Sequence, residues 1–309
     1  MKAAWIDRYG GPEVLQVREE VRPVPGAGEV LVRIRHAGLN VMDVKTREGD
    51  YDGSAVYGIR LPTRVGMEGA GIVEAVGEGV SEPGIGDRVA YCLVWNSHAE
   101  FAVVPAAKVM RVPDALDLRI AGTSTFQGLT AHYLANDVGR LRAGMSCLVH
   151  AATGGVGRML VSIAHRLGVA VYATVRREAG AEPVRQLGAA GVFPAADGAF
   201  VDPVLEATGG AGVDVVFDAI GAPTLRHDLR VVRTRGLVAS YGQSGGRVGD
   251  LDPAELGERG SLFLTRPRLQ DYLGEGAALR ARANDLYRQM VDGGFHVPLG
   301  RSYSLDRIA

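Results

Sequence analysis

The first third of the chain alternates short apolar runs with turns rich in glycine and proline. Polar and apolar positions alternate along 29–35, as expected for a half-buried strand. Further strand patterns follow at 69–77, 86–91 and 101–105. Short strands punctuated in this way predict a β-barrel or β-sandwich domain over residues 1–120.

The pattern changes after residue 120. Continuous apolar runs of strand length now alternate with helical patterns; the strands are expected at 146–151, 169–175, 213–219 and 236–241, and the helices at 159–167 and 224–233. Buried strands that alternate with helices are typical of a parallel sheet with right-handed crossovers. The sequence therefore predicts an α/β fold, with another helix at 279–291.

Composition narrows the classes of function. Among 309 residues, 34 Lys and Arg balance 35 Asp and Glu, which disfavours binding to nucleic acid or to anionic membranes. We expect neither a transmembrane helix nor a secretion signal, since no apolar run is long enough. Cys92 and Cys147 are too few for a disulfide scaffold or a cysteine-rich zinc lobe. These features predict a cytoplasmic protein.

A glycine-rich segment carries the first candidate chemistry. Gly154, Gly155, Val156 and Gly157 follow a strand pattern and open a helix pattern. Small residues let the backbone approach a pyrophosphate, and the N–H groups at a helix start favour anions. A tight turn without a ligand would use the same glycines.

The end of the next strand bears on the choice of dinucleotide. NAD-specific sites usually carry Asp or Glu about 20 residues after the glycines. This chain instead has Arg176 and Arg177. Guanidinium groups suit the additional 2′-phosphate of NADP, which favours NADPH, although two solvated arginines are the alternative.

Further motifs extend over nearly the whole chain, at 10–15, 38–43, 66–71, 86–89, 128–131, 151–157, 235–242 and 260–267. Together they resemble the zeta-crystallin-like quinone oxidoreductase branch of the medium-chain dehydrogenase/reductase superfamily. The resemblance implies a GroES-like β-barrel-type substrate domain over 1–120 and a doubly wound Rossmann domain over 121–265. Residues 266–309 would return to the first domain. Because relatives continue with a helix and a last strand, we interpret the C-terminal end as truncated.

The resemblance also implies NADPH as cofactor and direct hydride transfer to a quinone or enone. The implied cofactor contacts are Asn40, Val41, Met42, Asp43, Lys45, Thr130, Gly154, Gly155, Val156, Arg176, Arg177, Ser240, Tyr241, Gly242, Gln243, Leu264, Thr265 and Arg266. A lysine that usually follows the second Rossmann strand is replaced near Gly180.

Two residues are candidate catalytic groups. Asn40 is a candidate polar group near the nicotinamide or substrate, and the resemblance implies that Tyr51 matches a tyrosine that lines the quinone site. Either residue could donate a hydrogen bond to the carbonyl oxygen that gains charge during hydride transfer. The alternatives are a turn-capping role for Asn40 and a surface loop position for Tyr51, with Tyr57 nearby as a substitute. Asp43 would orient the same loop or cap a helix.

Zinc distinguishes this chain from alcohol dehydrogenases of similar fold. Those enzymes place Cys and His where this chain has Asn40 and Met67, and neither side chain is a usual zinc ligand. His98 is expected to be a surface or turn residue rather than a ligand. Without a Lewis acid an alkoxide is hard to stabilise, which favours acceptors activated by conjugation.

Other functions remain open. An enoyl-thioester reductase shares the fold and the glycine motif. Such an enzyme would need a wider entrance to its active site, and basic residues to bind the phosphopantetheine arm of the substrate. Near-neutral charge disfavours a lens-type structural or RNA-binding protein, and the preceding β domain disfavours an S-adenosylmethionine methyltransferase. We expect a homodimer, because the apolar segment 261–265 would form an exposed edge strand.

Overall fold

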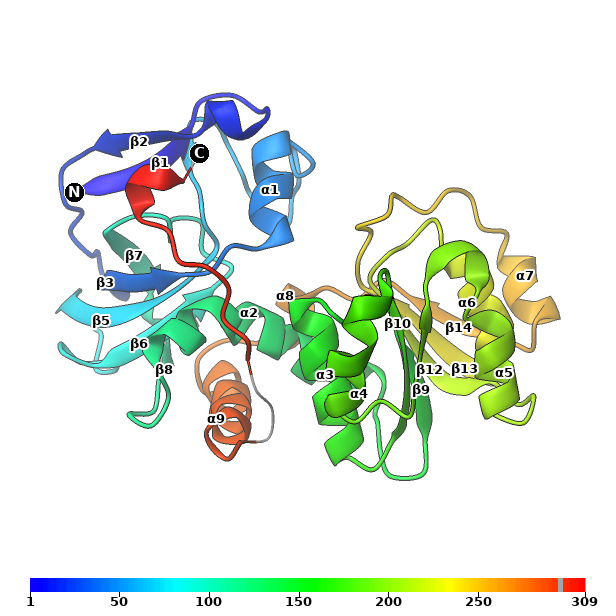
Figure 1. Ribbon diagram of the computed structural model, residues 1–309. Helices are drawn as coiled ribbons and strands as arrows, with labels where there is room; N and C mark the ends of the chain where they lie inside the picture. Colours follow the sequence, from blue (N-terminus) through cyan, green and yellow to red (C-terminus); the bar gives the residue numbers. More distant parts are fainter. Residues whose placement is uncertain (294–296, 309) are drawn as a thin grey trace. The chain divides into compact units, whose positions relative to one another are not determined.

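A six-stranded parallel sheet forms the centre of one part of the protein (Figure 1). The computed structural model describes residues 1–293 and 297–308. The strand order is β11-β10-β9-β12-β13-β14, and all pairings are parallel. The bounds are β9 Ser146–Val149, β10 Ala170–Val175, β11 Gly191–Pro194, β12 Val213–Asp218, β13 Val232–Ser240 and β14 Phe263–Thr265. This order is that of a dinucleotide-binding Rossmann sheet, which confirms the predicted fold class.

Helices cover both faces of this sheet (Figure 1). Helices α3 (Gly155–Arg166) and α4 (Ala181–Gln186) lie on one face, and α5 (Val201–Ala207) and α6 (Leu225–Val231) on the other. Because both faces are buried, the strands carry continuous apolar runs instead of alternating ones. Helices α7 (Pro253–Glu258) and α8 (Leu269–Leu273) flank β14 in the chain.

Two antiparallel sheets form the other part. The larger sheet has the order β7-β3-β5-β6-β8 and the smaller one β2-β1-β4. The bounds are β1 Lys2–Ile6, β2 Gln16–Glu19, β3 Glu29–Ala37, β4 Thr63–Arg64, β5 Glu68–Val76, β6 Arg88–Cys92, β7 Phe101–Pro105 and β8 Met110–Arg111. Alternate positions such as Val30, Val32 and Val104 pack into one apolar core. The β-rich domain expected from the first third of the sequence is therefore confirmed.

The described residues divide into two compact units, 1–126 with 274–292 and 297–308, and 127–273 with 293. The sequence placed the divisions at 120/121 and 265/266. Helix α2 (Leu118–Tyr133) continues through the first of these positions. Near the second, Tyr272 of α8 stacks on Tyr133 with ring centroids 4.7 Å apart, which keeps α8 with the parallel sheet.

One helix is shorter than its expected range. Helix α6 ends at Val231, because Val232 already pairs with Val213 of the neighbouring strand. Helices α1 (Val41–Glu48) and α9 (Ala277–Val291) belong to the antiparallel unit. Among the described helices, none combines the length and apolarity needed to cross a membrane.

Candidate active site

The glycine turn, residues 154–157, connects β9 to α3. Gly154 is the N-cap of α3, and the helix begins at Gly155. A Cβ added at Gly157 would lie 2.6 Å from the Ala151 carbonyl oxygen, and one at Gly155 would lie 1.7 Å from Gln127 Oε1. Gly157 thus has room for glycine only, because its neighbours are backbone atoms, whereas the contact at Gly155 is with the end of a flexible side chain. The N–H groups of the first helical turn have no partner within the helix, so this backbone fits an anionic pyrophosphate.

Arg176 and Arg177 follow β10 at the carboxyl edge of the same sheet. Both are exposed, and neither guanidinium group makes a hydrogen bond or ion pair to another described residue. A Cβ at Gly180 would lie 2.6 Å from Thr153 Cγ2, so the glycine turn leaves little room for a longer side chain there. Two unpaired guanidinium groups beside a glycine turn fit a dinucleotide that carries a 2′-phosphate.

A pocket of about 370 Å³ lies at the ends of β13 and β14. Arg266 donates to the carbonyl oxygens of Ser240, at 2.5 Å, and Gly242, at 2.9 Å, and so ties the two strand ends together. The lining residues are Leu225, Ser240, Gly242, Gln243, Arg247, Val248, Leu264, Thr265 and Arg266. Six of these were predicted as cofactor contacts. Leu225, Arg247 and Val248 were missed, because no motif marks them.

Besides the glycine turn and the two arginines, two predicted contacts of this unit do not line the pocket. Tyr241 uses its backbone N–H to donate to the Asp218 carbonyl oxygen at 2.8 Å. Thr130 is buried within α2. The assignment of these two residues to the cofactor stays a prediction.

Asn40 is the N-cap of α1 in the antiparallel unit. Its Nδ2 donates to Glu68 Oε2 at 3.0 Å, and its backbone N–H donates to Asp43 Oδ2 at 2.8 Å. Glu68 is fully buried and also accepts from the Phe126 N–H at 2.6 Å. Burial raises the pKa of Glu68 to about 8, although these hydrogen bonds oppose the rise. Asn40 therefore caps the helix while a buried carboxyl group orients its amide.

The first turns of α1 contain the other predicted contacts of this unit. Burial raises the pKa of Asp43, opposed mainly by the nearby His98. Lys45 pairs with Glu48 and Asp50, with N–O distances of 3.2 Å to each. Val41 is 66% exposed, whereas Met42 is half-buried. The helix thus has an exposed apolar residue directly beside the Asn40 amide.

Tyr51 lies just after α1 in a small aromatic group. Its ring centroid is 4.7 Å from that of Tyr57, and the Tyr57 ring meets Trp95 edge-on at 6.4 Å. Tyr51 and Tyr57 are both half-buried. Tilted and edge-on aromatic neighbours of this kind restrict the orientation of the phenol.

The expectation that His98 lies at the surface is wrong, although the residue does lie in a bent, irregular segment. His98 is only 6% exposed, and its Nε2 lies 3.1 Å from the Gly38 carbonyl oxygen. The backbone N–H of His98 also donates to the Val65 carbonyl oxygen at 3.1 Å, which holds the segment against the small sheet. One histidine in an irregular segment gave no periodicity from which its burial could be deduced.

The residues at the positions of the alcohol dehydrogenase zinc ligands do not fit a zinc site. The Asn40 amide donates to Glu68, and Met67 is a fully buried thioether. Within residues 1–293 and 297–308, no group of three or more His, Cys, Asp or Glu side chains is arranged to hold a metal ion. No step of the chemistry below therefore uses zinc.

Comparison with known proteins agrees with both units. The family described as "Alcohol dehydrogenase GroES-like domain" matches residues 26–114, and the one described as "Zinc-binding dehydrogenase" matches 155–274. The quinone oxidoreductase of Pseudomonas aeruginosa is 36% identical over 302 residues, which cover 97% of this chain and 91% of that protein. A 2-haloacrylate reductase of a Burkholderia species is 37% identical over 313 residues, covering 99% and 93%.

A solved structure shows the same architecture. The Escherichia coli quinone oxidoreductase in complex with NADPH superposes with a TM-score of 0.92 at 32% identity, covering 97% of this chain and 91% of that one. A GroES-like domain together with a Rossmann domain defines the class of medium-chain dehydrogenases and reductases. Within that class, this chain belongs to the quinone oxidoreductase family, which confirms the resemblance stated from its motifs.

Proposed function

We propose that this protein is an NADPH-dependent reductase that transfers hydride to a quinone or another conjugated carbonyl compound. The observation that carries the proposal is the sheet edge where the glycine turn and the unpaired Arg176 and Arg177 occur together. Membership of the quinone oxidoreductase family supports the class of acceptor.

Different residues bind the cofactor and the acceptor. Bound NADPH supplies the hydride. Backbone N–H groups of the glycine turn bind the pyrophosphate, and Arg176 and Arg177 bind the 2′-phosphate. The residues around the pocket at the ends of β13 and β14 contact the remainder of the dinucleotide. Asn40 and Tyr51 donate hydrogen bonds to the acceptor oxygen as it gains charge.

We also propose the roles of the two units and the location, assembly and partners of the enzyme. The antiparallel unit is the substrate domain, and the parallel unit binds the cofactor. We place the enzyme in the cytoplasm, as a homodimer that needs no zinc. Its partners are small molecules, with neither nucleic acid nor membrane among them.

The direct test is NADPH oxidation with a panel of acceptors. We expect quinones and enones to be reduced and simple aldehydes to react poorly, because hydride addition to a conjugated system needs little help beyond proximity. The panel includes enoyl-thioesters and 2-haloacrylates at matched concentrations. If none of the conjugated acceptors oxidised NADPH above the rate without enzyme, the proposed function would be wrong.

A second candidate activity is the reduction of a conjugated carbon–carbon double bond in an acid or thioester. The 37% identical relative is a 2-haloacrylate reductase, and this identity is as high as that to the quinone reductase. The same cofactor site would serve both activities. Turnover of 2-haloacrylates or enoyl-thioesters far above that of quinones would favour this candidate.

Tyr51→Phe is expected to lower kcat/KM for quinones by about tenfold, or about 1.4 kcal/mol of transition-state stabilisation. The lost phenol hydroxyl would no longer donate to the acceptor oxygen, whereas affinity for NADPH should stay nearly unchanged. Steady-state kinetics with one quinone measures the effect. Tyr57→Phe is the matched control, because its ring contacts that of Tyr51. A loss in Tyr57→Phe or Asn40→Ala alone would transfer the role to that residue.

Metal removal is expected to leave activity intact. Elemental analysis of the purified protein should find no stoichiometric zinc, because the Asn40 amide and the Met67 thioether are poor ligands for this ion. Full quinone reductase activity should remain after prolonged incubation with a strong chelator. One tightly held zinc per chain, with activity lost on its removal, would contradict the prediction.

Phe263→Lys is expected to dissociate the proposed homodimer. Phe263 is 61% exposed on β14, the edge strand of the parallel sheet, and an exposed apolar edge favours pairing with a second copy. Light scattering at micromolar concentration should show a dimer for the wild type and a monomer or aggregate for the variant. Ile85→Lys is the control, because Ile85 is 69% exposed outside any strand. A monomeric wild type would refute the proposal.

A further inference from the structure

One arginine in the lining of the pocket at the ends of β13 and β14 has no partner in the described part of the chain. Arg247 is exposed, and its guanidinium group makes no hydrogen bond or ion pair to another described residue. The other arginine of the lining, Arg266, donates to the carbonyl oxygens of Ser240 and Gly242 and so joins two strand ends. Arg247 is therefore the guanidinium group of this pocket that is available to a ligand.

The loop that carries Arg247 is fixed to the turn between β12 and α6. Three backbone hydrogen bonds connect residues 244–246 to residues 219–222, with N–O distances of 2.8 to 3.2 Å. The two segments approach so closely that a Cβ at Gly221 would lie 2.6 Å from the Gly246 carbonyl oxygen. The backbone just before Arg247 thus has a defined position in the parallel unit.

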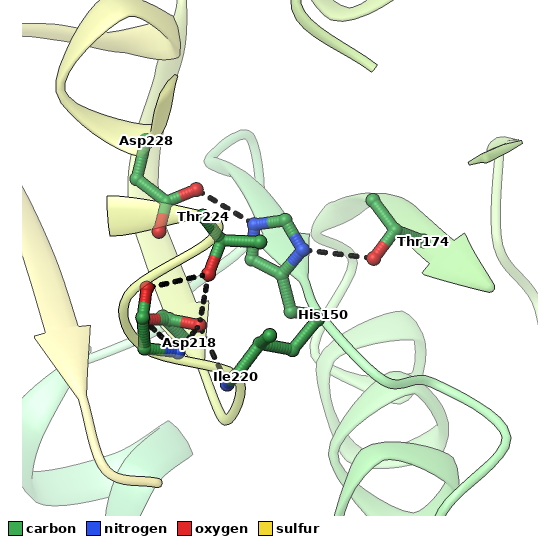
Figure 2. Close-up of polar contacts among 7 residues, drawn as sticks. His150, Thr174, Asp218, Ile220, Thr224 and Asp228 are labelled. Carbon is green, nitrogen blue, oxygen red and sulfur yellow. Dashed lines mark hydrogen bonds and ion pairs between the residues drawn. The ribbon is translucent and has the colours of Figure 1, made fainter. Parts of the chain in front are cut away.

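Buried side chains hold the turn between β12 and α6 in place (Figure 2). Asp218, the last residue of β12, accepts hydrogen bonds from the Ile220 N–H at 2.8 Å and from Thr224 Oγ1 at 2.9 Å. Asp228 of α6 lies with its Oδ1 2.7 Å from Nε2 of His150, which follows β9. The loop fixed to this turn therefore has a rigid support, which lowers the entropy that its side chains lose on binding a ligand.

The strand order indicates which part of the dinucleotide extends toward the pocket. Along the carboxyl edge of the sheet, Arg176 and Arg177 follow β10, the glycine turn follows β9, and β13 lies two strands beyond β9. The proposed sites of the 2′-phosphate and the pyrophosphate are thus at β10 and β9. At the usual spacing of neighbouring strands, β9 is about 10 Å from β13. The nicotinamide end of the dinucleotide is the part that remains for the pocket.

Arginine at this position is suited to one kind of ligand group. Its planar guanidinium binds a carboxylate through two parallel hydrogen bonds. The phosphates of NADPH are assigned to other strands, and the nicotinamide ring carries no anionic group. Beside Arg247, the side chains of Leu225, Val248 and Leu264 offer apolar surface to a carbon skeleton.

We propose that Arg247 binds a carboxylate carried by the acceptor, so that an acidic group on a conjugated carbonyl compound favours its reduction. The inference rests on the proposed NADPH-dependent reduction and narrows its class of acceptor. Arg247 would contact the acceptor at a group that does not itself react, and its role is specificity.

The test compares acidic acceptors with their neutral methyl esters. One pair is a naphthoquinone with a propanoate side chain and its methyl ester, and the other is monomethyl fumarate and dimethyl fumarate. The measured quantity is the ratio of kcat/KM for the acid to kcat/KM for the ester, at saturating NADPH. Arg247→Gln is expected to lower this ratio about tenfold in at least one pair, as for the loss of a charge-assisted hydrogen bond. Changes in folding or cofactor binding affect acid and ester alike and cancel in the ratio.

Two further variants separate the charge of Arg247 from other effects. Arg247→Lys keeps the positive charge without the planar fork, and its ratio should lie between those of the wild type and Arg247→Gln. Arg259→Gln removes an exposed arginine of the same unit that does not line the pocket, and should leave the ratio within about twofold of the wild type. Added salt should lower the wild-type ratio, because salt screens exposed ion pairs.

The outcomes separate the inference from the proposed function. If Arg247→Gln leaves the ratio unchanged in both pairs, the inference is wrong. A raised dissociation constant for NADPH together with an unchanged ratio would show that the arginine binds a phosphate of the cofactor instead. An equal fall in Arg259→Gln would attribute the effect to the overall charge of the protein and also contradict the inference. If the wild type oxidises NADPH with none of the acids, esters or unsubstituted quinones, the proposed function itself fails.

Discussion

Replacing Arg176 and Arg177 together with glutamate is expected to abolish the preference for NADPH over NADH. Each guanidinium–phosphate hydrogen bond contributes about 1.5–3 kcal/mol. Losing both corresponds to at least about a hundredfold in the ratio of kcat/KM values for the two cofactors. Repulsion between the new carboxylates and the 2′-phosphate adds to this loss, whereas NADH lacks that phosphate and should be less affected. Steady-state kinetics with both cofactors measures the ratio.

A control that reverses two other charges separates the loss of contacts to the 2′-phosphate from a change in the overall electrostatic field of the protein. Arg166 and Arg230 are exposed in the last turns of α3 and α6, at the helix ends away from the glycine turn. Reversing both charges should leave the cofactor ratio within about twofold of the wild type, since solvent and salt screen distant exposed charges. Equal use of NADH and NADPH by the unmodified protein would contradict the assignment of the two arginines.

Gly157→Ala is expected to impair both folding and cofactor binding. The new Cβ would lie 2.6 Å from the Ala151 carbonyl oxygen and 2.8 Å from Ala152 Cα, and backbone atoms of a buried turn cannot easily move aside. Overpacking of this kind costs about 1–3 kcal/mol, which corresponds to a fall in melting temperature of roughly 3–10 °C. NADPH affinity should fall as well, because α3 must shift away from the strand end.

The matched control is Gly257→Ala in the same unit. Gly257 lies in α7, and a Cβ there would meet no atom within 4 Å. Alanine is also the better helix former, so this variant should be as stable as the wild type or slightly more stable. Thermal unfolding with and without NADPH compares the two variants. A Gly157→Ala protein that melts and binds like Gly257→Ala would show that the glycine turn does not need its close approach.

Much of the fold could be predicted from local pattern. The apolar runs at 146–151 and 213–219 became β9 and β12, because a strand covered by helices on both faces needs apolar residues throughout. The segment expected as an edge strand became β14 at the end of the sheet. The boundary at 120 was misplaced, because α2 packs and hydrogen-bonds continuously through that position.

Some residues of the candidate site could also be predicted from the sequence, and others could not. Residues that follow strands in recognisable motifs could be named in advance, such as the glycine turn, Arg176 and the residues after β13. Leu225, Arg247 and Val248 could not, because they join the pocket only through the folding of a loop and a helix start. Their sequence surroundings carry no spacing that indicates a shared site.

The sequence by itself determined the fold class, the family, the glycine turn and the pair of arginines from which we predict a preference for NADPH. These depend on residue type and spacing along the chain, which local geometry translates directly into strands, helices and turns. Only the tertiary structure decided that His98 is buried, that Glu68 orients Asn40, and that His150 meets Asp228. His150 and Asp228 are far apart in the chain, and the fold buries both side chains at the same sheet edge, where the two are within hydrogen-bond distance.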